Sequence, residues 1–246
     1  MVNRIAVYAE GPTEWYAVYQ LCSRGILAQA EMIGKSDRNN IGPWLKNREQ
    51  MRNLFANQIS FPPCNGIFLV FDQEDDRFPL DTAKEIFGDA FSFSSSNAQE
   101  SLYRGQLDNG TQVALHVATA PSPDGNRDFD GYILDLLDKL EDDAVNIWIR
   151  EIAHDYLRAH FSNNNITNMQ IHELGRKEIP GLMVSFQWNI LRSKTLLYAY
   201  ITALQADRSH VWFSEKIIEF APPEVLRDVF VDLIAGWNLL AGGSNQ

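Results

Sequence analysis

Arg4–Leu21 reads RIAVYAEGPTEWYAVYQL, and this stretch decides the fold. Residues 5–9 form an unbroken apolar run of the length that a buried strand of a parallel sheet prefers. Glu10 follows at the end of that run, Gly11 allows a tight turn, and Pro12 suits the first position of a helix. Apolar residues then recur at helical spacing: Trp15, Val18, Tyr19 and Cys22. The stretch therefore predicts a strand, an acidic turn and an amphipathic helix.

Glu10 is the first candidate for a functional residue. Ligands of open α/β sheets bind beyond the carboxyl ends of the strands, and a carboxylate placed there points into the site. The alternative is that Glu10 only caps the helix, and its spacing alone leaves both roles open. Glu14 is a secondary candidate, in the first turn of the predicted helix, where the helix dipole favours a carboxylate.

A second apolar run, at 67–71, leads directly into the acidic segment 72–76, DQEDD. Asp72 and Glu74 are two residues apart, so an extended chain places both carboxylates on the same side, within reach of one cation. Asp76 takes the second position instead if the turn tightens. The alternative is a solvated acidic loop, but a second acidic strand end, at Glu10, favours a site.

The segment from Glu10 to Glu14, EGPTE, resembles the opening of the TOPRIM-like families, whose Glu-Gly-x-Thr/Asp-Glu signature carries the catalytic glutamate. The resemblance is to small TOPRIM-like proteins of prokaryotic defence loci, related to the TOPRIM domain of OLD-type nucleases. These families have an Asp-x-Asp motif at a later strand end, where this chain has Asp72-Gln73-Glu74. The second acid is therefore Glu, which keeps the charge and lengthens the side chain.

Two later parts of the chain resemble the same proteins more loosely. A third strand is predicted at 112–118, and the helix predicted at 133–140 has Leu134 where the family has a glutamate. Either Asp135 takes that role or the acidic position is lost, and Asp124 is a weaker candidate in the preceding loop. The resemblance also implies that Lys194 lies near the acidic centre, where it binds phosphate or balances charge. The alternative for Lys194 is a solvated lysine at a helix start.

The remaining pattern predicts helices at 44–59, 80–87, 145–156 and 196–204, and a final helix with apolar residues over 225–237 that ends at Gly242-Gly243. The resemblance implies a further short helix near 214–218 that closes the domain. Residues 91–104 show no period and are interpreted as an excursion over the surface, and Pro180-Gly181 is expected to interrupt the chain. His116, within the third strand, is expected to be a buried core residue. We therefore expect an α/β core over 1–143 and a mainly helical part over 144–246, packed on the core or continuous with it.

The chain has 246 residues and a formal net charge of −11. This charge argues against tight non-specific nucleic-acid binding over the whole surface, because such binding depends on Lys and Arg neutralising phosphates. It is compatible with a nuclease, since divalent cations offset the carboxylates of a metal site. No apolar run is long enough for a membrane span and the start does not resemble a signal peptide, which predicts a cytoplasmic protein without membrane association. Cys22 and Cys64 are expected to be incidental thiols.

The resemblance implies a TOPRIM-like Rossmannoid fold, with about four mostly parallel strands, flanking helices and a helical C-terminal elaboration. It implies a nuclease dependent on Mg²⁺ or Mn²⁺ that hydrolyses DNA in preference to RNA, in a defence system, with a protein partner and an optional homo-oligomer. The alternative is a TOPRIM-derived module, weakly active or inactive, that binds a partner protein or a nucleotide. The residues assigned to metal binding are Glu10, Asp72, Glu74 and Asp76. Those assigned to catalysis are Glu10, Asp72, Glu74 and Lys194.

Overall fold

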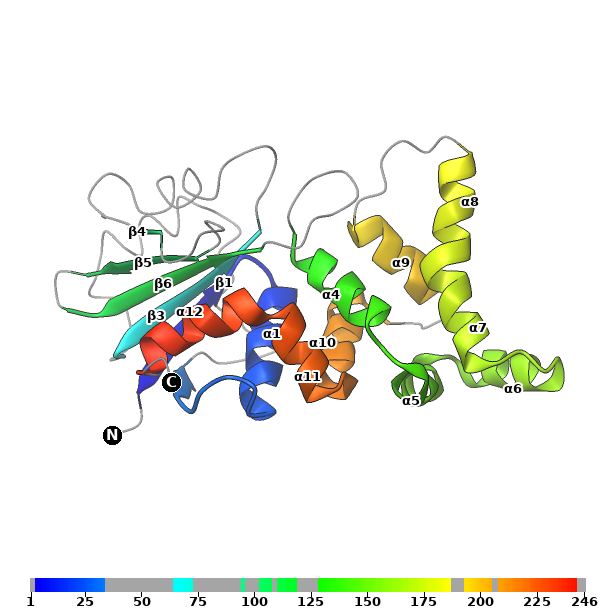
Figure 1. Ribbon diagram of the computed structural model, residues 1–246, viewed down its shortest axis with the longest axis horizontal. Helices are drawn as coiled ribbons and strands as arrows, with labels where there is room; N and C mark the ends of the chain where they lie inside the picture. Colours follow the sequence, from blue (N-terminus) through cyan, green and yellow to red (C-terminus); the bar gives the residue numbers. More distant parts are fainter. Residues whose placement is uncertain are drawn as a thin grey trace. The chain divides into compact units, whose positions relative to one another are not determined.

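The structure is a computed structural model that describes residues 3–33, 64–72, 94–95, 102–107, 110–118, 128–186, 193–204 and 208–242. The helices predicted at 44–59 and 80–87 lie outside these ranges. The chain forms two compact units (Figure 1). Unit 1 comprises Met1–Thr119 and Phe230–Gln246, and unit 2 comprises Ala120–Val229.

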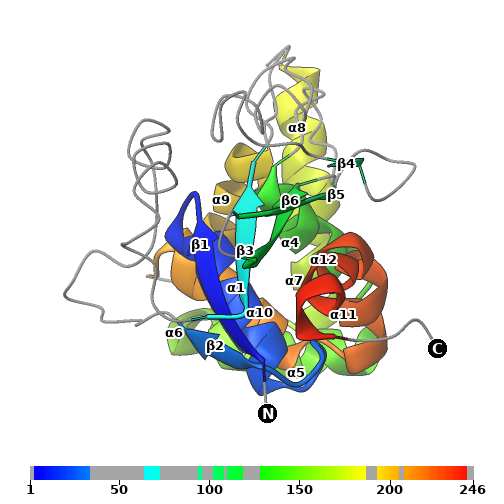
Figure 2. The same cartoon turned by 90° about the vertical axis from the view of Figure 1, so that its left-hand side faces the viewer.

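Within the described ranges, unit 1 contains a six-stranded sheet with the strand order β2-β1-β3-β6-β5-β4. The first four strands in this order are parallel, β5 is antiparallel to β6, and β4 is antiparallel to β5 (Figure 2). The bounds are β1 Arg4–Ala9, β2 Glu31–Ile33, β3 Gly66–Phe71, β4 Ser94–Ser95, β5 Leu102–Gln106 and β6 Gln112–Val117. The fold is thus α/β with a mostly parallel Rossmannoid sheet, as the sequence predicts.

All six residues of β3 are buried. Since successive side chains of a strand point to opposite faces of the sheet, both faces are covered at β3. On one face the ring of Phe68 meets the indole of Trp237 edge-on, with centroids 5.8 Å apart, so α12 (Val231–Ala241) packs there. Gly236 permits this approach, since a Cβ there would lie 2.8 Å from the Leu102 side chain and 2.9 Å from the Phe68 ring. The opposite face carries an apolar cluster: Ala6, Ile67, Leu69, Phe71, Tyr103, Val113, Leu115 and Val117.

The strands predicted at 5–9, 67–71 and 112–118 are confirmed as β1, β3 and β6, and the first helix is α1 (Pro12–Ser23). Tyr19 differs from its predicted place on the apolar face: it stacks on Trp15 and is 44% exposed. The prediction of an irregular excursion over 91–104 is wrong where β4 and β5 form. In β5 only Leu102 and Tyr103 are buried, and two apolar residues are too few to identify a strand.

The described part of unit 2 is helical, which confirms a helical elaboration of the C-terminal part. Its helices are α4 Phe129–Asp138, α5 Asp142–Ile152, α6 Asp155–Asn163, α7 Asn168–Glu173, η2 Leu174–Glu178, α8 Ile179–Ser185, α9 Ser193–Ala203, α10 His210–Phe220 and α11 Pro223–Val229. Here η2 is a π-helical turn that joins α7 to α8. The helices predicted around 133–140, 196–204 and 214–218 correspond to α4, α9 and α10.

Three predicted helix boundaries are wrong. The helix predicted at 145–156 ends at Ile152, because Ala153 is extended and His154 caps α6 by accepting a hydrogen bond at Nδ1 from the Tyr156 amide. Pro180-Gly181 does not interrupt the chain, since Pro180 falls in the first turn of α8, after the π-helical turn. The helix predicted at 225–237 is divided at Phe230 into α11 and α12.

The division between the units differs from the one expected at residue 143. α4 packs against α9, α10 and α11 in unit 2, whereas α12, at the end of the chain, packs on β3 and β6 in unit 1. The last helix therefore covers one face of the sheet that the N-terminal part of the chain forms. Of the helices in the described ranges, none is long and apolar enough to cross a membrane.

Candidate functional site

The acidic ends of β1 and β3 meet at one edge of the sheet. The two strands are parallel neighbours with Ala9 opposite Val70, so Glu10 and Asp72 follow them at the same edge. The Glu10 amide donates a hydrogen bond to the Val70 carbonyl at 3.0 Å. The Asp72 amide donates to Oε2 of Glu10 at 3.1 Å. The Glu10 carboxylate therefore lies across the end of the neighbouring strand, half-buried, beside the backbone of Asp72.

The turn between β1 and α1 places a second carboxylate nearby. Gly11 is the extended residue before α1 and Pro12 occupies the first helical position. Glu14 is only 6% exposed, and a Cβ on Gly11 would lie 2.9 Å from its Oε2. The Glu14 carboxylate thus lies against Gly11, in the first turn of α1. A side chain at position 11 would displace this carboxylate from its present position.

The donor chemistry of this edge fits a hard divalent cation. Mg²⁺ and Mn²⁺ prefer carboxylate and carbonyl oxygens, and Glu10 and Asp72 are half-buried carboxylates at one strand edge. Within the described ranges, however, no three carboxylate, His or Cys side chains gather closely enough to hold a metal ion. The two further ligands predicted, Glu74 and Asp76, lie outside those ranges.

The remaining candidate residues from the sequence either lie outside the described residues or belong to unit 2. Asp124 lies outside the described residues. Lys194 and Asp135 lie in unit 2, where Lys194 is exposed and Asp135 forms an ion pair with Lys139 at 3.1 Å. Leu134, which stands at the position of the family glutamate, is buried in α4. The roles predicted for Lys194, Asp124 and Asp135 therefore stay predictions.

Sequence reasoning missed a polar cluster inside unit 2. Nδ1 of His172 lies 2.7 Å from the Tyr200 hydroxyl, both side chains are buried, and burial lowers the pKa of His172 while it raises that of Tyr200. One turn beyond His172, the Arg176 guanidinium donates two hydrogen bonds to Asp138, at 2.9 and 2.5 Å. A Cβ on Gly175 would lie 2.7 Å from the Tyr200 ring. These residues are 28 to 38 positions apart in the pairs they form, so no local spacing predicts them.

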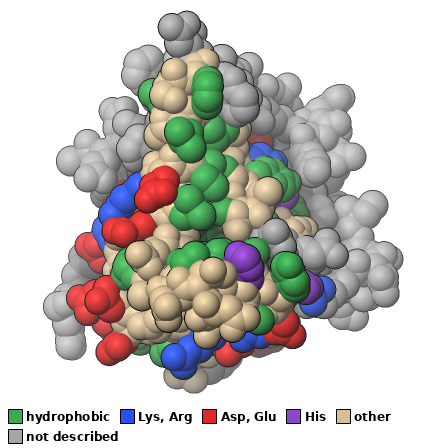
Figure 3. Space-filling view, turned by 90° about the vertical axis from the view of Figure 1, so that its right-hand side faces the viewer, with side chains coloured by type: hydrophobic (Ala, Val, Ile, Leu, Met, Phe, Trp, Pro, Cys, Tyr) green, Lys and Arg blue, Asp and Glu red, His purple; other side chains and the backbone are tan. Residues whose placement is uncertain are grey.

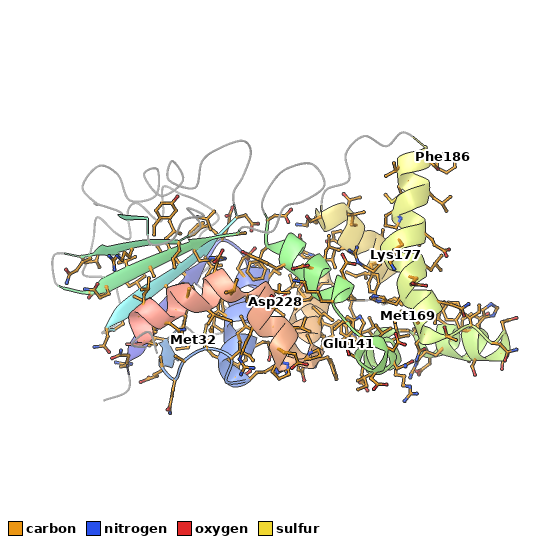
Figure 4. All side chains as sticks on the ribbon, viewed as in Figure 1. Met32, Glu141, Met169, Lys177, Phe186 and Asp228 are labelled. Atoms are coloured by element: carbon orange, nitrogen blue, oxygen red, sulfur yellow. The ribbon has the colours of Figure 1, made fainter. Side chains whose placement is uncertain are left out.

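An apolar surface lies on α8, where Leu182 and Val184 are each 58% exposed and Phe186 is 72% exposed. Figure 3 shows hydrophobic side chains gathered on this face of the molecule, and Figure 4 shows Lys177 and Phe186 along the continuous helix formed by α7, η2 and α8. We call Leu182, Val184 and Phe186 the α8 surface.

Neither protein-family models nor curated proteins nor solved structures match this chain.

Proposed function

We propose that the protein is a metal-dependent nuclease that hydrolyses phosphodiester bonds of DNA or RNA at the edge formed by Glu10 and Asp72. The hydrogen bond from the Asp72 amide to the Glu10 carboxylate carries this proposal. It shows that the acidic ends of two parallel strands are in contact, at the edge where α/β folds bind their ligands. The EGPTE segment and the resemblance to TOPRIM-like proteins supply the choice of nuclease among the activities such an edge supports.

In this proposal Glu10 and Asp72 hold Mg²⁺ or Mn²⁺, with Glu74 and Asp76 as the further ligands that follow β3. The bound cation would neutralise charge on the phosphodiester and lower the pKa of a water molecule. The Asp72 amide fixes the Glu10 carboxylate across the strand end, so that Glu10 is orientated before substrate arrives. Glu10 is also the candidate general base, as is proposed for the glutamate of TOPRIM-like proteins. Glu14 adds negative charge beside Gly11 and holds the turn that presents Glu10.

The biological setting follows from the resemblance and the charge. DNA as the preferred substrate, a role in prokaryotic defence and action in the cytoplasm are proposals that rest on the likeness to TOPRIM-like proteins. A protein partner is proposed because the net charge of −11 disfavours free-standing association with nucleic acid.

The first experiment is a calorimetric titration with Mn²⁺ and Mg²⁺, followed by incubation with supercoiled plasmid in the same buffers. We expect Glu10→Gln and Asp72→Asn each to weaken Mn²⁺ binding by more than about tenfold. Substitution of a residue that only hydrogen-bonds to a metal ligand typically already weakens metal binding by that factor. Metal-dependent nicking should be lost in both variants.

The matched controls are Asp142→Asn and Glu151→Gln, which remove exposed carboxylates from α5. Both controls should bind metal and nick plasmid as the wild type does, and circular dichroism should show that all four variants fold. Equal losses in the controls, or unchanged cleavage in Glu10→Gln and Asp72→Asn, would contradict the assignment of this edge.

A second function, the binding of a partner protein without catalysis, is favoured by the α8 surface. Monomeric proteins rarely expose contiguous apolar patches unless these serve an interaction. The buried Leu134 at the position of the family glutamate supports the same alternative. If the folded wild-type protein binds neither Mn²⁺ nor Mg²⁺ in the titration, partner binding without catalysis is the better description of its function.

A further inference from the structure

In unit 2, α9 packs against α10, and both helices are drawn in Figure 1. Cationic and aromatic residues occur near the start of each of these helices. Lys194 and Tyr198 lie one helical turn apart on α9. The Tyr198 hydroxyl lies 2.9 Å from Nδ1 of His210, the first residue of α10. The guanidinium carbon of Arg208 lies 5.4 Å from the centroid of the Trp212 ring. We call these five residues the cationic-aromatic patch.

The two permanent cations of the patch are not neutralised by ion pairs. Within the part of the chain that the structure describes, neither Lys194 nor Arg208 forms one, and both are exposed. Five other cations in the described part of unit 2 are paired with carboxylates: Lys139, Arg158, Arg176, Lys177 and Lys216. Asp130 interacts electrostatically with Lys194 without forming an ion pair; burial raises the pKa of this carboxyl, and Lys194 acts in the opposite direction. The patch is therefore a positive region in an acidic chain.

The helix geometry adds to this positive potential. Lys194 is the second residue of α9, and Arg208 directly precedes Ser209, whose hydroxyl caps α10. Both helices thus begin at the patch, and their N-terminal backbone amides favour an anion. Lys194 also lies close enough to His210 to lower its pKa, together with burial.

The aromatic groups supply a second kind of contact. Tyr198 is 43% exposed, so part of its side chain is open to contact with a planar group. The contact with Trp212 holds the Arg208 guanidinium in place, and a guanidinium plane also stacks on nucleobases. Cations that follow the phosphates, combined with aromatic rings that stack on bases, are the common features of proteins that bind single strands. A duplex cannot use the rings in this way, because its bases already stack on one another.

We propose that the cationic-aromatic patch binds single-stranded nucleic acid, with Lys194 and Arg208 contacting phosphates and Tyr198 stacking on a base. The inference rests on the proposed nuclease function for its choice of partner, and it adds a preference for single-stranded regions of the nucleic acid over duplex.

The test is fluorescence anisotropy with the full chain, EDTA and a labelled oligodeoxythymidine of about 12 nucleotides, a length within the range that single-strand binders cover. Lys194→Ala and Arg208→Ala should each weaken binding and reduce the slope of log Kd against log salt by about 0.7, the value for one phosphate contact on a single strand. Tyr198→Leu should weaken binding by about tenfold with an unchanged slope, because stacking involves no counterion release.

The controls are Arg227→Ala and Tyr156→Leu, which remove an exposed arginine from α11 and a 71% exposed tyrosine from α6. Both should bind as the wild type does, and a duplex of the same length should bind more weakly. Absence of wild-type binding, or equal effects in patch and control variants, would overturn the inference.

EDTA prevents metal-dependent cleavage, so this experiment separates the inference from the proposed function. If the oligonucleotide binds through the patch but the protein does not cleave plasmid, only the proposed nuclease function is contradicted. If the protein cleaves plasmid but the patch variants bind the oligonucleotide as the wild type does, only the inference about the patch is contradicted.

Discussion

The two units place their polar groups in opposite ways. In unit 1 the central strand β3 is apolar throughout, His116 is a buried polar residue of β6, and the acidic groups Glu10 and Asp72 come where the strands end. In unit 2 polar groups lie among the helices, as in the buried contact between His172 and Tyr200. Polar groups that interrupt an apolar run mark a candidate site in the sequence, whereas polar groups that join two distant helices leave no local mark.

The units also differ in how glycine contributes to packing. In unit 1, Gly236 lets α12 lie directly on the sheet beside Phe68. In unit 2, Gly175 lets the π-helical turn η2 lie on the ring of Tyr200. The first contact is between apolar groups, and the second surrounds a hydroxyl that needs its hydrogen bond to His172. Unit 1 should therefore be most sensitive to lost apolar volume, and unit 2 to changes in polar geometry.

The largest effect is expected from Trp237→Ala on α12. The indole is fully buried, meets Phe68 edge-on and donates a hydrogen bond from Nε1 to the Ala28 carbonyl at 2.8 Å. Removing it should lower the free energy of unfolding by about 3–5 kcal/mol, as for other buried aromatic residues changed to Ala. Urea unfolding followed by circular dichroism measures this loss.

The control on the same helix is Leu239→Ala, since Leu239 is 43% exposed. It should cost less than about 1 kcal/mol, in the range of most surface substitutions. Similar losses for the two variants would show that α12 does not hold the sheet through Trp237.

A smaller effect is expected from Gly175→Ala, with Gly181→Ala as its matched control. A methyl group on Gly175 would overlap the buried Tyr200 ring, which should cost about 1–3 kcal/mol by overpacking. Gly181 lies in α8 with no atom within 4 Å of the added methyl group, so Ala should stabilise the helix by up to about 1 kcal/mol. Urea unfolding of both variants tests the prediction, and a shift of the same sign in both would contradict it.

The next prediction concerns pH and compares one histidine in each unit. Burial lowers the pKa of His116 in β6 to about 3. Burial also lowers the pKa of His172, with Arg176 and Lys177 acting in the same direction and Asp138 and the Leu137 carbonyl opposing them. Each group takes up its proton more readily in the unfolded chain than in the folded one. Stability should therefore be fully present above about pH 6.5, the pKa of an unperturbed histidine, and fall as the pH decreases below it.

Each histidine contributes at most about 1.4 kcal/mol per pH unit to that decrease. The window is wider for His116, whose folded pKa is about 3. Replacing it by His116→Leu should flatten the dependence of unfolding free energy on pH between 5 and 6.5, and His172→Asn should do so to a smaller degree. Urea titrations across this range measure the slopes, and unchanged slopes in both variants would show that neither histidine is responsible.

The sequence predicted β1, β3 and β6 because β1 and β3 contain continuous apolar runs and β6 is apolar apart from Gln112 and His116. The runs in β1 and β3 also predicted that the acidic strand ends meet, as they do in the structure. It did not predict β5, where only two residues are buried, or the division between α11 and α12. That division depends on which unit each helix packs against, since both carry apolar residues at helical spacing. The cluster around Tyr200 was also missed, because its contacts join residues from separate helices.

The smallest effect is expected for Asp135, which the resemblance made a candidate for the acidic centre. In the structure its carboxylate pairs with Lys139 at 3.1 Å, and Lys139 also pairs with Asp228 on α11 at 2.7 Å. All three side chains are well exposed, so Asp135→Asn should cost no more than about 1 kcal/mol, the upper range for surface ion pairs. Asp228→Asn is the matched control, because it removes the other carboxylate from the same lysine. If Asp135 acts only in this ion pair, both variants should keep wild-type Mn²⁺ affinity, whereas loss of metal binding in Asp135→Asn alone would return it to the catalytic centre.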